Sequence, residues 1–181
     1  MKYFLKFCNF LLLFCTITTV SKAQKISQFD SEPILKEARL NFESNNVEMG
    51  ANLLVNYVRE KRKENPLGYT YGMEAAKVAE LSLDDSTAIR VIQNLGKNYS
   101  TPQDLALRQG IEAILLECYA KGKKWQDGIQ LIQSEHRNEK KNFALNIDVL
   151  SFNRALAVAG LTNAAIRVLN LFFEEPTKIN D

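Results

Sequence analysis

The phrase GIQLIQSE at residues 128–135 decides the fold, because a phrase of the same pattern occurs four times along the chain. Each copy runs small, apolar, polar, aliphatic, aliphatic, and successive copies begin 38, 40 and 37 residues apart. The other copies are GANLLVNY at 50–57, AIRVIQNL at 88–95 and AIRVLNLF at 165–172. A period of this length predicts stacked units of supersecondary structure that bury their apolar faces against one another.

The spacing of apolar residues predicts helices throughout. They recur at three- and four-residue intervals, and we find no sustained alternation of apolar and polar residues of the kind that predicts strands. We therefore expect an all-α fold of eight helices in four antiparallel pairs, with the repeated phrase opening the second helix of each pair. The first helices are predicted at 31–45, 67–82, 102–120 and 141–159. The second helices are predicted at 47–63, 86–98, 125–137 and 162–175.

The predicted helix ends carry capping and turn residues. Thr101, Pro102 and Asp104 predict a capped start, with the hydroxyl as cap, proline in the first turn and a carboxylate near the positive end of the helix dipole. Asp84, Asp85 and Ser86 are predicted to cap the start of the helix at 86–98 in a similar way. The turns within pairs contain residues that tolerate tight or left-handed conformations, at Asn45-Asn46, Leu83-Asp84, Gly122 and Gly160.

The small residue at the start of each phrase predicts a close crossing of two helices near their connecting turn. These openers are Gly50, Ala88, Gly128 and Ala165. The aliphatic pairs lie one turn further along the same helix face and are expected to form the axial core. They are Leu53/Leu54, Val91/Ile92, Leu131/Ile132 and Val168/Leu169.

The first 23 residues are typical of a cleavable export signal: Lys2 and Lys6, an apolar run over 7–20, then Ser21-Lys22-Ala23. The run is too short to span a bilayer comfortably. We expect an exported protein, periplasmic or secreted, with no direct membrane insertion after cleavage. The predicted division is a signal at 1–23, a short segment at 24–30, a repeat domain at 31–175 and a tail at 176–181.

The charge of the mature chain differs from that of the full sequence. Removing Lys2, Lys6 and Lys22 from the 23 basic residues leaves 20 against 21 acidic residues, a net charge of −1 in place of +2. A near-neutral chain has no basic excess to attract nucleic acid or an anionic membrane, so neither is an expected partner.

Residue types that carry catalysis or bind metals are sparse. Cys118 is the single cysteine after cleavage and lies in an apolar helical run, which predicts a buried hydrophobe. His136 is the single histidine, which leaves no second one for a common zinc site. The eight glycines are scattered singly, so no phosphate-binding loop is present in the sequence. We expect no enzyme activity, cofactor or metal, although two carboxylates facing each other across a groove remain an alternative.

The third and fourth units carry a resemblance to a known family. The stretches YAKGKKWQDGI at 119–129 and ALAVAGLTNAAI at 155–166 resemble the turn and second-helix opening of tetratricopeptide repeats. Pro66, Pro102 and Pro176 lie roughly where that family places proline. Glu37 and Ala75 stand where its first helices usually have a large apolar residue, and a related helical-hairpin repeat stays open. The resemblance covers nearly the whole mature chain.

The resemblance implies a right-handed α-solenoid of about four antiparallel pairs, whose first helices line a concave groove that binds a peptide or partner protein. One row of groove residues follows from spacing, 11 residues before each opener: Arg39, Lys77, Glu117 and Arg154. This row is interpreted either as a charged lining for a carboxylate-bearing segment or as an ordinary solvated helix face.

The last helix differs from the other copies. Six residues beyond the opener it has Leu171 where the others have asparagine or serine, and eight residues beyond it has Phe173. A solenoid end is usually polar, so the apolar pair is predicted either to be covered by the tail or to dock on another chain, including a second copy in a homodimer.

Together these patterns predict a non-catalytic scaffold or adaptor of the bacterial cell envelope that binds a protein partner through the groove or the C-terminal helix. A self-assembling structural subunit is the second hypothesis. A helical enzyme with a site in the groove is the third.

Overall fold

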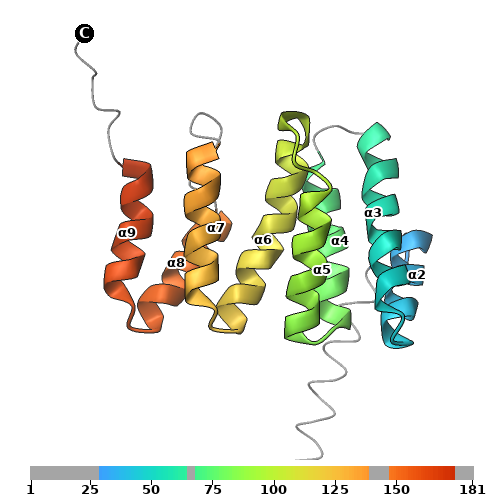
Figure 1. Ribbon diagram of the computed structural model, residues 1–181, viewed down its shortest axis with the longest axis horizontal. Coiled ribbons are helices and arrows are strands. Elements are labelled where there is room, and N and C mark those ends of the chain that lie inside the picture. The colour runs from blue at the N-terminus through green and yellow to red at the C-terminus, as the bar shows by residue number, and fades with distance from the viewer. Residues whose placement is uncertain (1–28, 65–67, 139–146, 174–181) are drawn as a thin grey trace, which may run out of the picture.

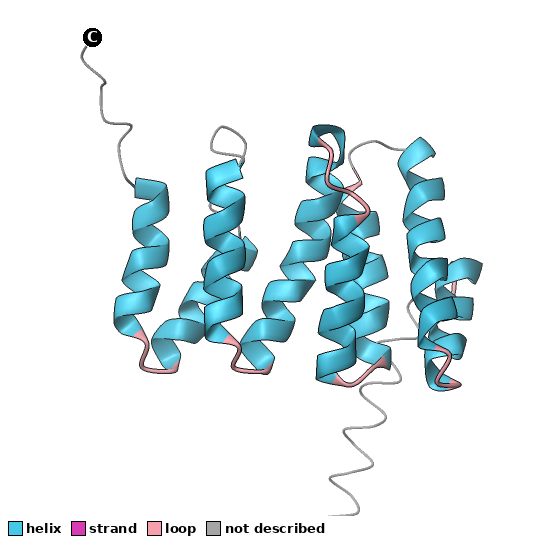
Figure 2. Ribbon diagram, viewed as in Figure 1, coloured by secondary structure: helices cyan, strands magenta, loops and turns pink. Residues whose placement is uncertain are grey.

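The computed structural model describes residues 29–64, 68–138 and 147–173. This part of the chain contains eight α-helices, one short 3-10 helix and no strand (Figures 1 and 2), which confirms the all-α prediction. None of its helices combines the length and apolar character needed to cross a membrane. The elements are α2 (Pro33–Glu43), α3 (Val47–Glu64), α4 (Tyr69–Ser82), α5 (Asp85–Lys97), η1 (Pro102–Asp104), α6 (Leu105–Lys121), α7 (Trp125–Asn138), α8 (Ile147–Val158) and α9 (Thr162–Phe173).

Each predicted helix is present, and most bounds agree within two or three residues. The predictions for residues 141–146 and 174–175 fall outside the described part of the chain. The predicted signal at 1–23 and the tail at 176–181 lie outside it as well.

The two predicted helix caps have different outcomes. The carboxylate of Asp84 accepts hydrogen bonds from the backbone N–H groups of Ser86 and Thr87, both at 3.1 Å, which confirms the cap. Hydrogen bonds from Thr87 and Ser86 hold the pKa of Asp84 well below its usual range. The prediction at Thr101 is wrong, because its hydroxyl donates to the Asp104 carboxylate, at 2.5 Å, and makes no cap.

Left-handed residues close three of the turns. Asn45, at φ 61°, and Gly160, at φ 80°, adopt this conformation as predicted. The chain also turns at Gly122 as predicted, with φ −77° at this glycine, and Lys123 takes the left-handed conformation, at φ 54°. The Lys124 N–H then donates to the Tyr119 carbonyl at 2.8 Å, which closes a Schellman-type helix end.

The helices lie side by side in chain order along the long axis of the molecule (Figure 1). Each helix contacts the next one, and α2, α4, α6 and α8 also contact one another in succession. The other helices do so only in part, because α3 touches α5 and α7 touches α9, whereas no Cα atom of α5 comes within 8 Å of one in α7. This missing contact interrupts an otherwise regular arrangement.

The closest crossing joins α4 and α6, whose mutual contact is the most extensive between any two described helices. A glycine on each of the two helices makes this close approach possible. A Cβ atom built on Gly110 would lie 2.0 Å from the carbonyl oxygen of Tyr69, and one built on Gly72 would lie 2.2 Å from that of Leu107. The two backbones therefore touch directly, with no room for a side chain at either position.

The predicted close crossing near the connecting turn is confirmed at Gly50, whereas Gly128 packs against the first helix of the next pair. A Cβ atom on Gly50 would lie 2.4 Å from the ring of Phe42, and one on Gly128 would lie 2.2 Å from the ring of Phe152. The openers Ala88 and Ala165 are buried too. One turn further on, the core contains Leu54, Ile92 and Ile132, each at most 1% exposed. Burial of each such side chain contributes about 1.5–3 kcal/mol.

Cys118 is 4% exposed, and burial raises the pKa of its thiol to about 12, with a smaller contribution from the negative charge of Glu80. At pH 8 roughly one such thiol in ten thousand is ionised. We expect a disulfide reagent to label residues 24–181 at least about 100-fold more slowly in the native state than in denaturant. Fast labelling without denaturant would contradict the burial of this thiol.

Candidate functional site

The predicted charged row is only partly brought together. Lys77 of α4 and Glu117 of α6 meet directly, with 2.7 Å between Nζ and Oε2. Arg39 instead pairs with Asp30 and with Glu43, at 3.1 and 2.7 Å. Arg154 is exposed on α8 and makes no ion pair with another described residue.

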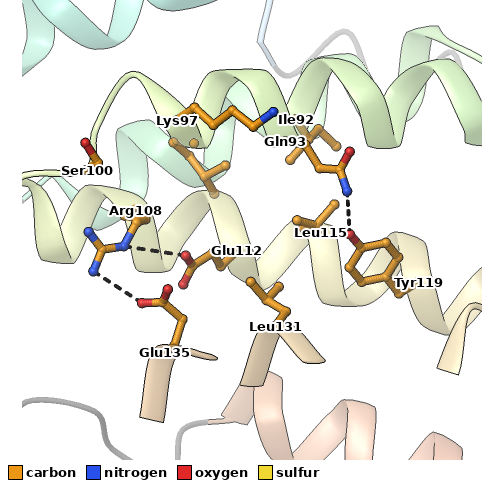
Figure 3. A pocket seen from close by; sticks show the side chains of 12 residues that line it. Ile92, Gln93, Lys97, Ser100, Arg108, Glu112, Leu115, Tyr119, Leu131 and Glu135 are labelled. Atoms are coloured by element: carbon orange, nitrogen blue, oxygen red, sulfur yellow. Dashed lines mark hydrogen bonds and ion pairs between the residues drawn. The ribbon is translucent and has the colours of Figure 1, made fainter. Parts of the chain in front are cut away.

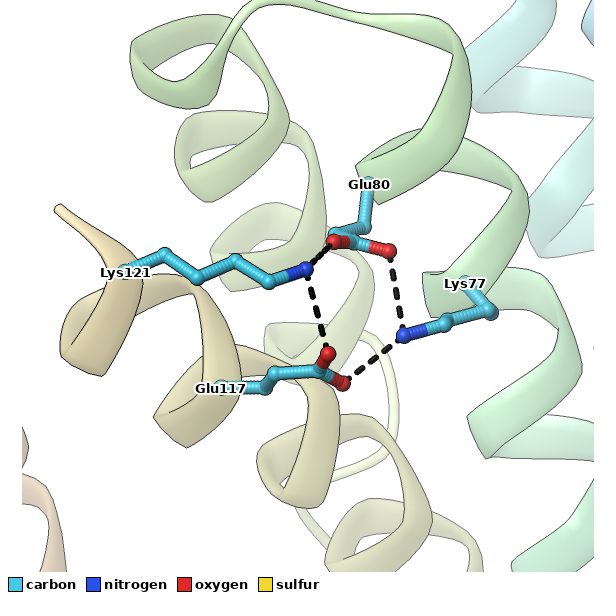
Figure 4. Close-up of polar contacts among 4 residues, drawn as sticks. All are labelled: Lys77, Glu80, Glu117 and Lys121. Carbon is cyan, nitrogen blue, oxygen red and sulfur yellow. Dashed lines mark hydrogen bonds and ion pairs between the residues drawn. The ribbon is translucent and has the colours of Figure 1, made fainter. Parts of the chain in front are cut away.

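Lys77 and Glu117 belong to a closed cluster of four alternating charges with Glu80 and Lys121 (Figure 4). Lys77 is 3.1 Å from Glu80, and Lys121 is 3.1 Å from Glu117 and also contacts Glu80. Burial alone would raise the pKa of Glu117, but hydrogen bonds from Lys77 and Lys121 outweigh it and lower the pKa. The cluster links α4 to α6, and a carboxylate-bearing ligand would have to displace Glu117 from Lys77.

The two apolar residues predicted to dock at the C-terminal end lie on α9. Leu171 is half-buried and packs against the hydrophobic core, so part of its surface is used within the chain. The side chain of Phe173 falls outside the described part. The predicted docking through this pair stays a prediction.

A groove of about 560 Å³ opens where α5 and α7 do not touch, and its base is α6 (Figure 3). Its floor is apolar and combines side chains from all three helices, namely Ile92, Ile111, Leu115 and Leu131. Gly96 of α5 also lines the groove. A Cβ atom built there would have only Ile111 nearby, at an ordinary 3.7 Å.

Paired polar groups stand at the two ends of this floor (Figure 3). At one end Arg108 of α6 lies 3.5 Å from Glu112 and 3.2 Å from Glu135 of α7, with all three side chains at most 15% exposed. At the other end the Gln93 amide donates to the Tyr119 hydroxyl at 2.7 Å, which ties α5 to α6. Burial raises the pKa of Tyr119, so this hydroxyl stays protonated at neutral pH.

The chemistry of the groove is that of a binding surface. An apolar floor with hydrogen-bonding groups at its ends is typical of sites that hold a peptide or an apolar side chain by burial. Both glutamates at the one end face Arg108, which balances one of their two negative charges. Among the described residues no three His, Cys, Asp or Glu side chains are placed to hold a metal ion together.

Sequence reasoning missed the groove, although two signals mark it. The interval between the second and third phrases is the longest of the three, at 40 residues. The second phrase is also followed by Gly96, where the other copies have Val58, His136 and Phe173. A longer unit leaves more space beside the pair that follows it. Glycine at position 96 adds to that space, because it has no side chain.

The fold and the groove define the class as an all-α protein with an open apolar groove between two of its helices. No family model, curated protein or solved structure matches the chain.

Proposed function

We propose that the chain is an exported, non-catalytic scaffold of the bacterial cell envelope that binds a partner protein. We also propose that its helices form a tetratricopeptide-like, right-handed α-solenoid of four pairs. The recurring phrase, the short turns within pairs and the contacts between alternate helices support this architecture. The signal-like residues 1–23 support export.

The groove between α5 and α7 carries the proposal of protein binding. Its floor is apolar and open, and its volume of about 560 Å³ is that of a site for a few side chains. Each apolar side chain buried there would contribute up to about 1.5–3 kcal/mol. Two or three such side chains would contribute about 3–9 kcal/mol before the cost of ordering a peptide, and micromolar affinity needs about 8 kcal/mol net, so hydrogen bonds at the two ends of the groove would have to add to the burial.

Replacing Gly96 with tryptophan tests the groove, because the indole would fill the space above Ile111 from an exposed edge of α5. We expect the tagged Gly96→Trp variant of residues 24–181 to lose the crosslinked partner that the wild type captures from the envelope fraction. Its helical circular dichroism should be unchanged.

Gly96→Ala is the matched control. Its methyl group meets Ile111 at an ordinary distance and alanine favours the helix, so we expect partner capture to persist and stability to rise by about 0.5–1 kcal/mol. Retained capture in both variants would show that the partner binds elsewhere.

A further inference from the structure

Exposed apolar side chains gather on the last two helices. Of the seven large apolar residues that are exposed in the described part of the chain, five lie on α8, on α9 or in the turn between them. These five are Ile147, Leu150, Val158, Leu161 and Ile166. No described helix follows α9.

Ile166 shows why this surface is open. It is the residue after its opener, and its counterparts in the two preceding pairs are Ile89 and Ile129. Those two are each 5% exposed, whereas Ile166 is 50% exposed. In the third pair the neighbouring opener Gly128 lies against Phe152 of α8, the first helix of the next pair. Ile166 therefore stands at a position that is buried in the two preceding pairs, each of which is followed by another first helix.

The first helix of the last pair, α8, also exposes apolar side chains whose counterparts in earlier pairs are buried. Leu150 is 41% exposed, whereas Ala113, at the same distance before its opener, is 6% exposed. Val158 is 82% exposed, whereas its counterpart Leu81 is 9% exposed, and the third pair has Lys121 there. These side chains form, with Ile166, a face that would receive one more first helix.

The charge on this face selects among possible occupants. Arg154 stands at the position of Lys77, which pairs with Glu117 of the following first helix at 2.7 Å. The only carboxylate on α8 and α9 is Asp148, which accepts a hydrogen bond from Tyr69 at 2.7 Å. A second copy related by a two-fold axis would set this cationic face against itself, without a carboxylate to balance it.

A second copy stacked head to tail fits no better. It would present the outward side of α2, where Lys36 and Glu37 are exposed together with Leu40, which is 46% exposed, to the apolar face of α8 and α9. Burial of these two charges against Leu150 and Ile166 would be costly.

We infer that the face formed by Leu150, Arg154, Val158 and Ile166 docks an amphipathic helix of a different protein, which takes the place of one more first helix and places a carboxylate opposite Arg154. This inference rests on the proposed scaffold function and names the chemistry of its partner. The apolar residues provide burial, and Arg154 selects an acidic helix and fixes its register.

A peptide with the sequence of α6 is the probe, because it carries Glu117 at the required place. It spans Leu105–Lys121, with Cys118→Ala to prevent oxidation, and the charge-reversed peptide also carries Glu117→Lys. We expect residues 24–181 to bind the Glu117 peptide at least tenfold more tightly than the charge-reversed peptide. The Arg154→Glu variant should reverse this preference, and Ile166→Lys should weaken both peptides at least tenfold.

Other results would overturn the inference. Equal binding of both peptides, or binding unaffected by Ile166→Lys, would show that this face does not dock the helix. A dimer that forms with concentration and is lost in Ile166→Lys would assign the face to a second copy. A tenfold gain in peptide affinity after truncation at Phe173 would assign it to residues 174–181. The scaffold proposal is tested separately, because capture that fails in Gly96→Trp but persists in Ile166→Lys would overturn the inference alone.

Discussion

Replacing Gly110 with alanine is expected to destabilise the folded chain by about 3 kcal/mol, although alanine favours a helix over glycine by about 1 kcal/mol. The added Cβ atom would lie 2.0 Å from the carbonyl oxygen of Tyr69 and 3.0 Å from the backbone nitrogen of Met73. Both neighbours are backbone atoms of α4, so no side-chain rotation can relieve the overlap. The two helices have to separate and open the core between them, which places the cost at or beyond the upper end for overpacking.

Urea unfolding of residues 24–181, followed by circular dichroism, measures this effect. Gly96→Ala makes the same chemical change in the neighbouring helix α5, where the nearest atom to the new methyl group is 3.7 Å away. The two variants should therefore shift the midpoint in opposite directions, Gly110→Ala downward and Gly96→Ala upward. A similar shift for both would contradict the direct backbone contact between α4 and α6.

The helices and their pairing order could be predicted from the sequence, because a repeated phrase reports the same local packing four times. The small residue at Gly50 predicted a close crossing within its pair, and the ring of Phe42 lies directly against it. Local signals were less reliable at the ends of helices. Thr101 has the chemistry of a cap, yet its hydroxyl bonds to Asp104, because that carboxylate lies within reach and is buried.

The groove between α5 and α7 was not predicted, because the phrases were used for what the units share, whereas the signals that mark the groove, the longest interval and Gly96, are differences between units. A groove forms where two units differ. In addition, α6 touches α4 directly at Gly72 and Gly110, which lie outside the phrases. Long-range contacts of this kind are visible only after the helices are placed in space.

The charged row of Arg39, Lys77, Glu117 and Arg154 could also be predicted only in part. Spacing placed Lys77 and Glu117 at equivalent positions and left open whether they bind a ligand or face solvent. In the folded chain they bond to each other and to Glu80 and Lys121, neither of which belongs to the row. Ion pairs form between whichever charges long side chains can reach, so a periodic pattern predicts the position of a charge better than its partner.

The chain that connects α5 to α6 is held by one buried carboxylate. Asp104 is 2% exposed and accepts the hydroxyl hydrogen of Thr101. Its other oxygen lies 2.8 Å from Nη2 of Arg62, in the last turn of α3. The pair joins two helices that are far apart in sequence, and it does so at the point where α6 begins.

Replacing Arg62 with methionine is expected to cost about 2–3 kcal/mol, because the buried Asp104 carboxylate loses its counter-charge while the apolar stem at residue 62 is kept. The value lies below the usual cost of breaking a buried pair, since Arg62 is 42% exposed and water can reach the site.

Asp104→Asn should cost less, about 1 kcal/mol, because the guanidinium that remains can turn to solvent. Combining the two changes should recover part of the loss in Arg62→Met, and urea midpoints of the four proteins measure this coupling. Strictly additive losses would mean that the ion pair between Arg62 and Asp104 does not stabilise the folded chain.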